Sequence, residues 1–310
     1  MIKPRSLSLI SNRIYSEQGG RRIPESTIEL DYCLAWFLTK LADHPLNNSL
    51  AFKGGTCLRR CHIPEYRFSE DMDFTRTDKS VFVDIQRGFK QICDAMKSDS
   101  GITMVYKDMD RHPHSNSYTF RMAYIGPIGK EREVKVDITK DEKIVRPLEK
   151  KPLLRSYPEF SDIPTGPLVT AYSIDEIIIE KILALSDKSR CQPRDLYDLW
   201  NLTNSGKVDI GGIGCDLLPK LYHHKRRTDT VDSEIDSKEG KLRSAWSTRL
   251  EAQMSSVPEF DGAFRHVRRF VKGVLEVSRE IERNNRAADD DGRGGAGNKP
   301  NNYKNHEHEM

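Results

Sequence analysis

The sequence predicts an α/β (α+β) fold with a mixed sheet in the first half, followed by a mostly helical C-terminal half. Several segments before residue 140 alternate polar and apolar side chains, which is typical of half-buried strands. After residue 166 the apolar side chains recur at helical spacing instead. We therefore expect an α/β domain over residues 1–165, a helical domain over 166–283 that completes a site, and a disordered tail over 284–310.

The composition is that of a soluble protein with a modest core. Of the 310 residues, 36 % are hydrophobic and 31 % charged, and the formal charge of +3 permits a nucleic-acid partner without arguing for one. No stretch approaches the ~18 apolar residues of a membrane span, and the first residues lack the apolar core of a signal peptide. The six cysteines include no Cys-x-x-Cys pair, which is typical of proteins whose thiols stay reduced. We expect a cytoplasmic protein with no membrane partner.

Helical and strand periods alternate along the first half. Two segments, residues 25–43 and 79–97, carry apolar side chains at helical spacing. Between the first two expected strands, Gly54 and Gly55 predict a turn, and Thr56 can cap the short helix that follows. Alternating or short apolar stretches predict five strands, at residues 49–53, 71–75, 102–108, 117–125 and 133–139.

The second half is dominated by helical spacing. Ser173 caps a strongly apolar helix that ends at Leu185, and Glu176 takes the position of the acidic residue in a capping box. From Asn284 onward the sequence holds almost no apolar residue, which is typical of a disordered tail. Three further segments are rich in helical spacing, at residues 194–203, 212–226 and 240–282.

Three aspartates form the pattern from which a chemistry can be inferred. Asp71 and Asp73 are separated by one residue on an expected strand, so they project from the same face. If the strand that carries Asp137 is adjacent, three carboxylates meet, and such a group repels itself unless cations neutralise it. Two Mg²⁺ ions about 3.5–4 Å apart are a known arrangement for in-line displacement at phosphorus. We therefore expect Asp71, Asp73 and Asp137 to bind two magnesium ions.

The glycine turn supplies the other half of this pattern. Without side chains at Gly54 and Gly55, backbone N–H groups can approach a triphosphate, and the N-terminus of the following helix adds its dipole. Thr56 can donate its hydroxyl to the same phosphate oxygens. A nucleoside triphosphate and the two metal ions would therefore meet between the turn and the Asp-x-Asp strand.

A strand, a Gly-Gly turn, a short helix and an Asp-x-Asp strand in this order resemble the core of the DNA-polymerase-β-type nucleotidyltransferase superfamily. The complete set of motifs resembles the AbiEii-type nucleotidyltransferase toxins of bacterial abortive-infection and toxin–antitoxin systems. The resemblance covers roughly residues 25–205. Its motifs are Phe52-Lys-Gly-Gly-Thr-Cys-Leu58, Arg67-Phe-Ser-Glu-Asp-Met-Asp-Phe74, Val134-Lys-Val-Asp-Ile-Thr139, Glu180-Lys181 and Arg190 with Arg194-Asp-Leu-Tyr-Asp-Leu199.

This resemblance implies a magnesium-dependent enzyme that moves a nucleoside monophosphate from a nucleoside triphosphate to an acceptor hydroxyl. The implied acceptor is an RNA end, with the tRNA 3′ end as the leading candidate, and a cognate antitoxin should be encoded nearby. The implied catalytic residues are Asp71, Asp73, Asp137, Lys181 and Asp195. The implied nucleotide-binding residues are Lys53, Gly54, Gly55, Thr56, Ser69 and Lys181.

The later motifs also allow ordinary structural roles. Lys181 is the one lysine in an apolar helix, where it could contact the triphosphate or extend to water beside Glu180. Asp195 could face the site or form a helix ion pair with its neighbours. Ser69 could hold Asp71 in place or touch the substrate.

Acceptor recognition is the least determined part of the prediction. On a helix, a group of basic residues could follow a phosphate backbone or form a solvated face; it comprises Arg265, Arg268, Arg269 and Lys272. Two other functions compete with RNA modification. One is a transferase of the same fold that acts on a small molecule or a protein side chain, and the other is a non-catalytic nucleotide-binding interaction protein.

Overall fold

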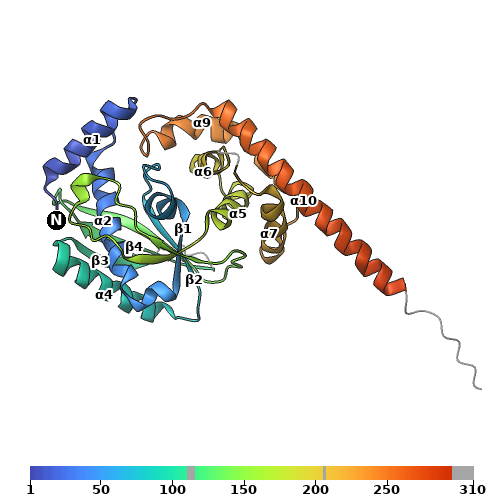
Figure 1. Ribbon diagram of the computed structural model, residues 1–310, viewed down its shortest axis with the longest axis horizontal. Coiled ribbons are helices and arrows are strands. Elements are labelled where there is room, and N and C mark those ends of the chain that lie inside the picture. The colour runs from blue at the N-terminus through green and yellow to red at the C-terminus, as the bar shows by residue number, and fades with distance from the viewer. Residues whose placement is uncertain (110–115, 205–206, 295–310) are drawn as a thin grey trace, which may run out of the picture.

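In the computed structural model, described over residues 1–109, 116–204 and 207–294, a mixed seven-stranded sheet forms the first half (Figure 1). The strand order is β3-β4-β5-β2-β1-β7-β6. β2 pairs with β5 and β1 with β7 in parallel, whereas the other neighbours are antiparallel. The strands are β1 Leu50–Lys53, β2 Asp71–Arg76, β3 Thr103–Met109, β4 Ser117–Ile125, β5 Glu131–Thr139, β6 Glu149–Pro152 and β7 Leu168–Ala171.

The period-2 pattern divides this sheet into an apolar and a polar face. On the apolar face, Phe74 of β2 and Phe120 of β4 both contact the ring of Phe89 on α4. The polar face carries the aspartates of β2 and β5. The helices of the first half are α1 Pro4–Gln18, α2 Glu25–Ala42, α3 Gly54–Cys57 and α4 Phe82–Ser100. Of these, α2 and α4 pack on the apolar face, so the polar face is left for a site.

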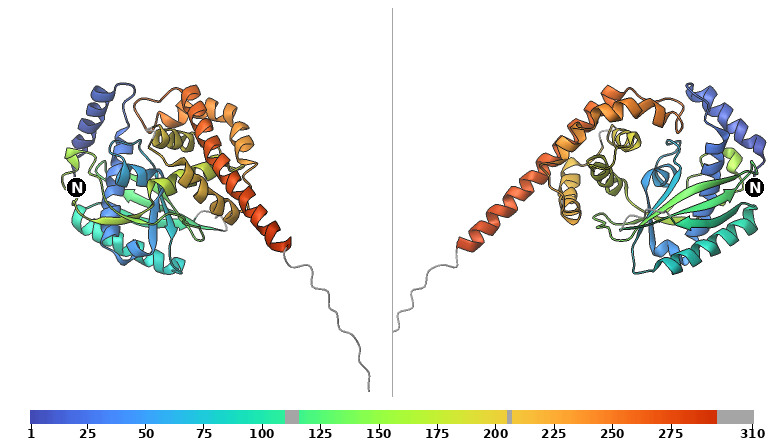
Figure 2. Two further views of the ribbon diagram at one scale, coloured as in Figure 1. Left: turned by 45° about the vertical axis from the view of Figure 1, so that its right-hand side comes forward. Right: turned by 180° about the vertical axis from the view of Figure 1, so that it is seen from behind.

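The second half is helical, as expected. Its first helices, α5 and α6, lie next to the polar face, and the long α10 packs on α6 and α7 before it projects beyond the rest of the molecule (Figure 2). The helices are α5 Ile174–Leu185, α6 Pro193–Thr203, α7 Ile210–His223, α8 Val231–Asp236, α9 Glu239–Leu250 and α10 Phe260–Gly294. None of the helices that the structure describes is long and apolar enough to span a lipid bilayer.

The segment between α9 and α10 returns to the first half and closes on α1. The backbone N–H of Arg21 donates to Ser255 O at 2.9 Å, and that of Phe68 donates to Gln253 O at 2.8 Å. The Ser255 hydroxyl donates to Gln18 Oε1 at 2.7 Å. The two halves are therefore joined at this contact as well as through the chain between β7 and α5.

The mixed sheet and the five expected strands are confirmed, but some boundaries differ. β7 follows residue 165 and still belongs to the sheet, because a four-residue strand is too short to give a period. The segment 240–282 is divided into α9 and α10 at residues 251–259.

The long last helix continues to Gly294, past the expected start of the tail at Asn284. Arg286, Ala287 and Ala288 are strong helix formers, and a helix that has already formed extends at one hydrogen bond per residue. The rest of the expected tail, residues 295–310, lies outside the described residues. The first helix, α1, was not expected from the sequence.

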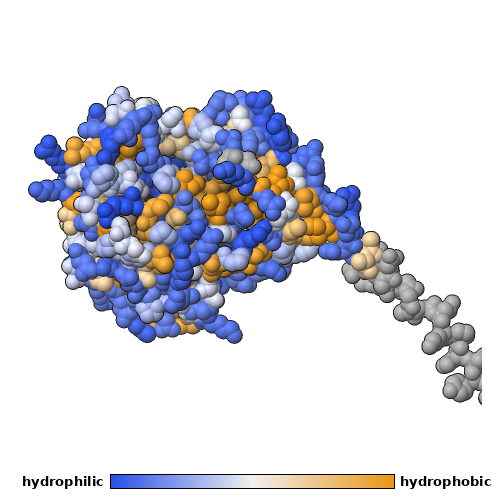
Figure 3. All heavy atoms as spheres, viewed as in Figure 1, coloured by the Kyte–Doolittle hydropathy of each residue, from blue (hydrophilic) through white to orange (hydrophobic). Residues whose placement is uncertain are grey.

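Apolar and polar side chains are unevenly distributed on the surface. Figure 3 shows apolar side chains gathered across the middle of the face seen in Figure 1, whereas the outer parts of that face are hydrophilic. This band lies where the sheet layer meets the helices of the second half. The junction of the two halves is thus the least polar part of this face.

Candidate active site

Strand register brings two of the predicted aspartates directly side by side. Asp73 of β2 pairs with Asp137 of β5, and on its other side Asp73 pairs with Lys53 of β1. Asp71 lies two residues before Asp73 and so shares its face of the sheet. The polar face therefore carries a row of one lysine and two aspartates across three strands, with a third aspartate beside it.

The glycine turn lies directly against this row. Gly54 has φ +78°, in the left-handed region that glycine adopts without strain, and a Cβ added there would lie 2.4 Å from Asp73 Oδ2. At Gly55 an added Cβ would lie 2.6 Å from a guanidinium nitrogen of Arg67 and 3.1 Å from Ser69 Oγ. Both glycines are thus needed for close packing of the turn, the first against Asp73 and the second against the loop that leads into β2.

Thr56 does not cap the short helix, in contrast to our expectation. The helix α3 begins at Gly54, so Thr56 lies inside it, and the N-cap position is taken by Lys53 without a side-chain hydrogen bond. The Thr56 hydroxyl donates instead to Asp71 O at 2.5 Å, and its side chain is buried. Thr56 and the buried Ser69 therefore support the turn and β2 from behind.

A cavity of about 210 Å³ lies over the row of charged residues, between the sheet and α5. It contains six of the residues predicted from the sequence, namely Lys53, Gly54, Asp73, Asp137, Lys181 and Asp195. Four predicted residues are not among its lining: Gly55, Thr56, Ser69 and Asp71. The cavity also contains polar residues to which the sequence gave no role, namely Thr139, Tyr172, Glu180 and Arg190.

The carboxylates of the row are only partly neutralised by the protein. The pKa of Asp73 is raised above its ordinary value, first by burial and then by the negative charges of Asp71 and Asp137, against the opposing charges of Lys53 and Arg194. Carboxylate oxygens are also the ligands that Mg²⁺ prefers. The chemistry of the donor set therefore fits a divalent cation.

Lys181 points inward and is held between two buried aspartates of α6. Its Nζ lies 2.8 Å from Asp195 Oδ1 and 2.6 Å from Asp198 Oδ2. Asp198 also accepts from Arg67 Nε at 2.7 Å, and Asp195 from Arg190 Nε at 2.7 Å. Although burial raises it, the charges of Arg67 and Lys181 lower the pKa of Asp198 to about 2. Both aspartates are thus ionised, and they fix the lysine at the edge of the cavity.

A second chain of buried charges links the cavity to α7. Lys53 Nζ lies 3.0 Å from Thr139 Oγ1 and 3.4 Å from Glu180 Oε2. Glu180 also pairs with Lys220 of α7, which is fully buried and lies 2.7 Å from Glu176 Oε1. Burial raises the pKa of Glu180, but the charges of Lys53 and Lys220 lower it to about 2. Glu176 therefore binds Lys220 and does not complete the expected capping box, although Ser173 caps the helix as expected.

Asp71 has a different partner from the other two aspartates. Its Oδ2 lies 3.1 Å from a guanidinium nitrogen of Arg194, near the start of α6. Within the described residues 1–109, 116–204 and 207–294, no three Asp, Glu, His or Cys side chains lie close enough together to hold a metal ion as they stand. The three aspartates therefore do not form a metal site in this arrangement, in which Asp71 is paired with Arg194.

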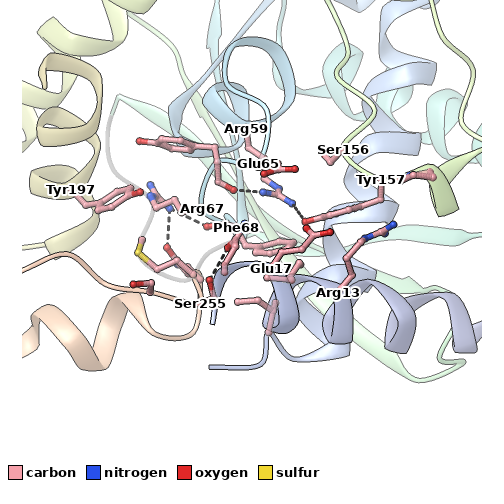
Figure 4. Close-up of a pocket in the computed structure, with 18 residues that line it drawn as sticks. Arg13, Glu17, Arg59, Glu65, Arg67, Phe68, Ser156, Tyr157, Tyr197 and Ser255 are labelled. Atoms are coloured by element: carbon pink, nitrogen blue, oxygen red, sulfur yellow. Dashed lines mark hydrogen bonds between the residues drawn. The ribbon is translucent and has the colours of Figure 1, made fainter. Parts of the chain in front are cut away.

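A second and larger cavity, of about 510 Å³, lies between α1, the loop before β2 and residues 253–256 (Figure 4). Arg59 donates to Asp31, Tyr157 and the carbonyl of Tyr66, and Arg67 donates to Asp198 and to groups of the cavity wall. The donors of both arginines are thus taken up by the protein itself. We assign no ligand to this cavity.

The geometry of turn, strands and charged helix can be compared with known proteins. The family model of the nucleotidyl transferase AbiEii toxin, type IV toxin–antitoxin system, matches residues 36–270. The chain belongs to this family. It is a nucleotidyltransferase of a toxin–antitoxin system, as the motifs predicted. A search of the curated proteins found no significant match.

Solved structures agree with this assignment at the level of the fold. The chain is similar to MenT4, nucleotidyltransferase toxin Rv2826c from Mycobacterium tuberculosis H37Rv, with a TM-score of 0.62 and 16 % sequence identity. The similarity covers 89 % of this chain and 92 % of MenT4. At this identity the likeness concerns the fold alone.

Sequence reasoning missed several charged groups around the site of this AbiEii-family chain. Lys220 was not singled out, because it reaches Glu180 only through the packing of α7 on α5. Arg190 was seen as part of a motif without a role. A signal for Lys220 does exist in the sequence, since a lysine between Leu218 and Leu221 on a helix is expected to need a buried partner.

We predict that Gly54→Ala disturbs the active site, whereas Gly19→Ala does not. Both glycines have positive φ, a sparsely populated backbone conformation for other residues, so each substitution should cost about 1–3 kcal/mol of stability. An added Cβ meets no atom within 4 Å at Gly19 but collides with Asp73 at Gly54. Nucleotide transfer by Gly54→Ala should therefore fall by about tenfold or more, because displaced catalytic groups lose their alignment. Equal transfer rates in the two variants would contradict this role of the turn.

We predict that Lys220→Met destabilises the protein by about 3–5 kcal/mol at pH 7, because it leaves the buried Glu176 without its lysine and Glu180 with Lys53 alone. The pKa of Glu180 is lowered from 4.5 to about 2 in the folded state, so its contribution is present above pH 4.5 and is lost as the pH falls toward 2. The deficit of the variant should therefore shrink at acid pH. Urea unfolding across this range measures it, with Lys241→Met on the surface of α9 as the control. A deficit equal to that of the control would exclude this charge chain.

Proposed function

We propose that this chain transfers a nucleoside monophosphate from a nucleoside triphosphate to an RNA hydroxyl, with the tRNA 3′ end as the leading acceptor, in a magnesium-dependent reaction. The observation that carries this proposal is the row of Lys53, Asp73 and Asp137 packed against the Gly54 turn. Carboxylates for cations then lie beside a phosphate-binding turn, as nucleotidyl transfer requires.

Asp71, Asp73 and Asp137 would hold the magnesium ions, which supply positive charge to the triphosphate and to the attacking oxygen. Asp137 helps to take the proton of the acceptor hydroxyl, whose oxygen forms a bond to the α-phosphorus. The bond from that phosphorus to the pyrophosphate oxygen breaks. Negative charge then develops on the pyrophosphate, and Lys181 stabilises it. Lys53 and Arg190 also line the cavity and add two further positive charges.

Asp195 acts through Lys181 and Arg190, because its two oxygens accept from both cations. It fixes them at the edge of the cavity, so that neither has to be ordered when the triphosphate binds. Gly55, Thr56 and Ser69 contribute by holding the turn and the start of β2. This arrangement supports catalysis by positioning and charge, with little covalent chemistry by the protein.

The acceptor assignment is supported by a basic groove along α10. The groove, of about 540 Å³, contains four cations and only two carboxylates, and the guanidinium of Arg268 lies 2.5 Å from Asp236 Oδ2. The cations are Arg265, Arg268, Arg269 and Lys272. A second groove, between the segment after α7 and α10, contains six basic residues and three carboxylates. The basic residues are Lys225, Arg226, Arg227, Arg279, Arg283 and Arg286. Clustered cations of this kind attract a phosphate backbone.

The family description also carries a proposal about partners. A toxin of a toxin–antitoxin system is controlled by an antitoxin, so we propose that a cognate antitoxin is encoded beside this chain. We further propose that the enzyme works in the cytoplasm, where nucleoside triphosphates and RNA are available.

We predict that α-³²P-labelled nucleoside triphosphates transfer label to a tRNA-sized band of total bacterial RNA in the presence of Mg²⁺. Asp71→Ala/Asp73→Ala should lower the transfer by about 100-fold or more, since the charges that hold the metal ions and phosphates are lost. Asp137→Ala should do the same without unfolding the protein. Label in protein or in a small molecule instead of RNA would replace the proposed acceptor. Undiminished transfer by folded Asp137→Ala would refute its assigned role.

We predict that Arg268→Glu/Arg269→Glu weakens RNA binding by about tenfold or more at low salt and leaves nucleotide binding unchanged, because neither arginine lines the cavity beside the glycine turn. The matched control is Lys90→Glu/Lys97→Glu on α4, which packs on the opposite face of the sheet. Electrophoretic mobility shifts with tRNA and a fluorescent nucleotide measure the two affinities. Unaltered RNA affinity, or an equal loss of nucleotide affinity, would rule out this surface.

A further inference from the structure

Two arginines of the same motif lie at the site but have different partners. Arg190 binds Asp195, with Nε 2.7 Å from Oδ2, and both belong to the second half of the chain. Arg194 instead crosses to the sheet and lies 3.1 Å from Oδ2 of Asp71. Both partners of this second pair are partly exposed, at 28 % for Arg194 and 24 % for Asp71. The pair is thus open to solvent and to ligands, in contrast to the buried ion pairs around Lys181.

Asp71 lies close enough to Asp73 for its charge to act on that carboxylate, but its own carboxylate is engaged by Arg194. Asp73 and Asp137 line the cavity, whereas Asp71 is not among its lining residues. In the part of the chain that the structure describes, the aspartates do not form a group that could hold a cation as it stands. A carboxylate oxygen that accepts from a guanidinium cannot give the same electron pair to a metal ion, so the two cations compete for it.

The position of Arg194 also bears on the triphosphate. Its charge acts on Asp73 as well as on Asp71, so the guanidinium lies near the row that borders the cavity. An arginine released from a carboxylate presents a planar set of donors that fits phosphate oxygens. Lys53, Lys181 and Arg190 already line the cavity, but each is paired with a carboxylate.

We propose that Arg194 exchanges partners during nucleotide binding. It neutralises Asp71 until a divalent cation binds there, and it then binds the triphosphate that arrives with the metal. This inference rests on the proposed function, because it takes Asp71 as a metal ligand. Arg194 thereby delays the assembly of the metal site until the nucleotide is present, since the nucleotide supplies the new partner for the guanidinium.

The first test is Mn²⁺ binding without nucleotide, measured on the full chain by calorimetry and by electron paramagnetic resonance. Arg194→Gln should bind Mn²⁺ about two- to fivefold more tightly than the unmodified chain, because it removes a competitor held by a partly exposed ion pair. Arg190→Gln is the matched control, since Arg190 also carries a guanidinium whose charge acts on Asp73, but its partner is Asp195 and not Asp71. Unchanged Mn²⁺ affinity in Arg194→Gln, or an equal gain in Arg190→Gln, would overturn the proposal.

The second test measures the affinity for ATP, for which we expect a loss instead of a gain. Arg194→Gln should bind ATP with Mn²⁺ more weakly than the unmodified chain, and Arg194→Lys should recover part of the affinity, because it keeps the charge but loses the planar donors. If Arg194→Gln binds both Mn²⁺ and ATP more tightly, the proposed contact between Arg194 and the triphosphate is wrong. Circular dichroism on each variant establishes that it is folded.

Asp71→Asn separates the failure of this inference from that of the proposed function. If Asp71→Asn binds Mn²⁺ as well as the unmodified chain does, Asp71 is no metal ligand, and both the proposed metal site and the exchange are wrong. If Asp71→Asn binds Mn²⁺ more weakly but Arg194→Gln matches the unmodified chain, the proposed function stands and the exchange alone is wrong.

Discussion

The accumulation of negative charge on one face of the sheet is the constraint on which the rest of the site depends. Asp73 and Asp137 are fixed side by side by the parallel pairing of β2 and β5, so their repulsion cannot be relieved by a change of backbone. The protein brings cations from three segments to this face, namely Lys53 from β1, Arg190 from the connection between α5 and α6, and Arg194 from the first turn of α6. Helices α5 and α6 are anchored by apolar side chains such as Ile178 and Leu196, which are fully buried in the core, and the charged groups border the cavity.

The buried charges around the cavity are arranged so that each is matched locally. Lys181 lies between two aspartates, and Lys220 lies between glutamates. Burying such ions is unfavourable unless their partners are well placed, so these networks define a single arrangement of α5, α6 and α7 more than they add stability. A rigid arrangement suits an enzyme of this class, because its reaction depends on the alignment of substrate, metal and charge.

The sequence predicts those features of the site that depend on neighbouring residues. It does not predict those that depend on how distant elements pack. The alternation within β2 and β5 was enough to place Asp71, Asp73 and Asp137 on one face, and the positive φ of Gly54 follows from the glycine turn. The partner of Asp71 could not be predicted, because side-chain pairing across the halves depends on how α6 packs. The same holds for Lys220, which reaches Glu180 from a separate helix. The short strands β6 and β7 lack a long enough period to be recognised, whereas α1 carries Leu7, Ile10 and Ile14 at helical spacing and was overlooked.

The closure of residues 253–256 on α1 has a consequence for how substrates enter. A Cβ at Gly20 would lie 1.8 Å from Ser255 O, so the two segments are in direct backbone contact. The halves are also joined through the chain before α5 and through ion pairs between them, such as Arg67 with Asp198 at 2.7 Å and Lys53 with Glu180 at 3.4 Å. These contacts are spread around the cavity and leave the halves little freedom to separate. A substrate therefore reaches the cavity through its open side, without the halves moving apart.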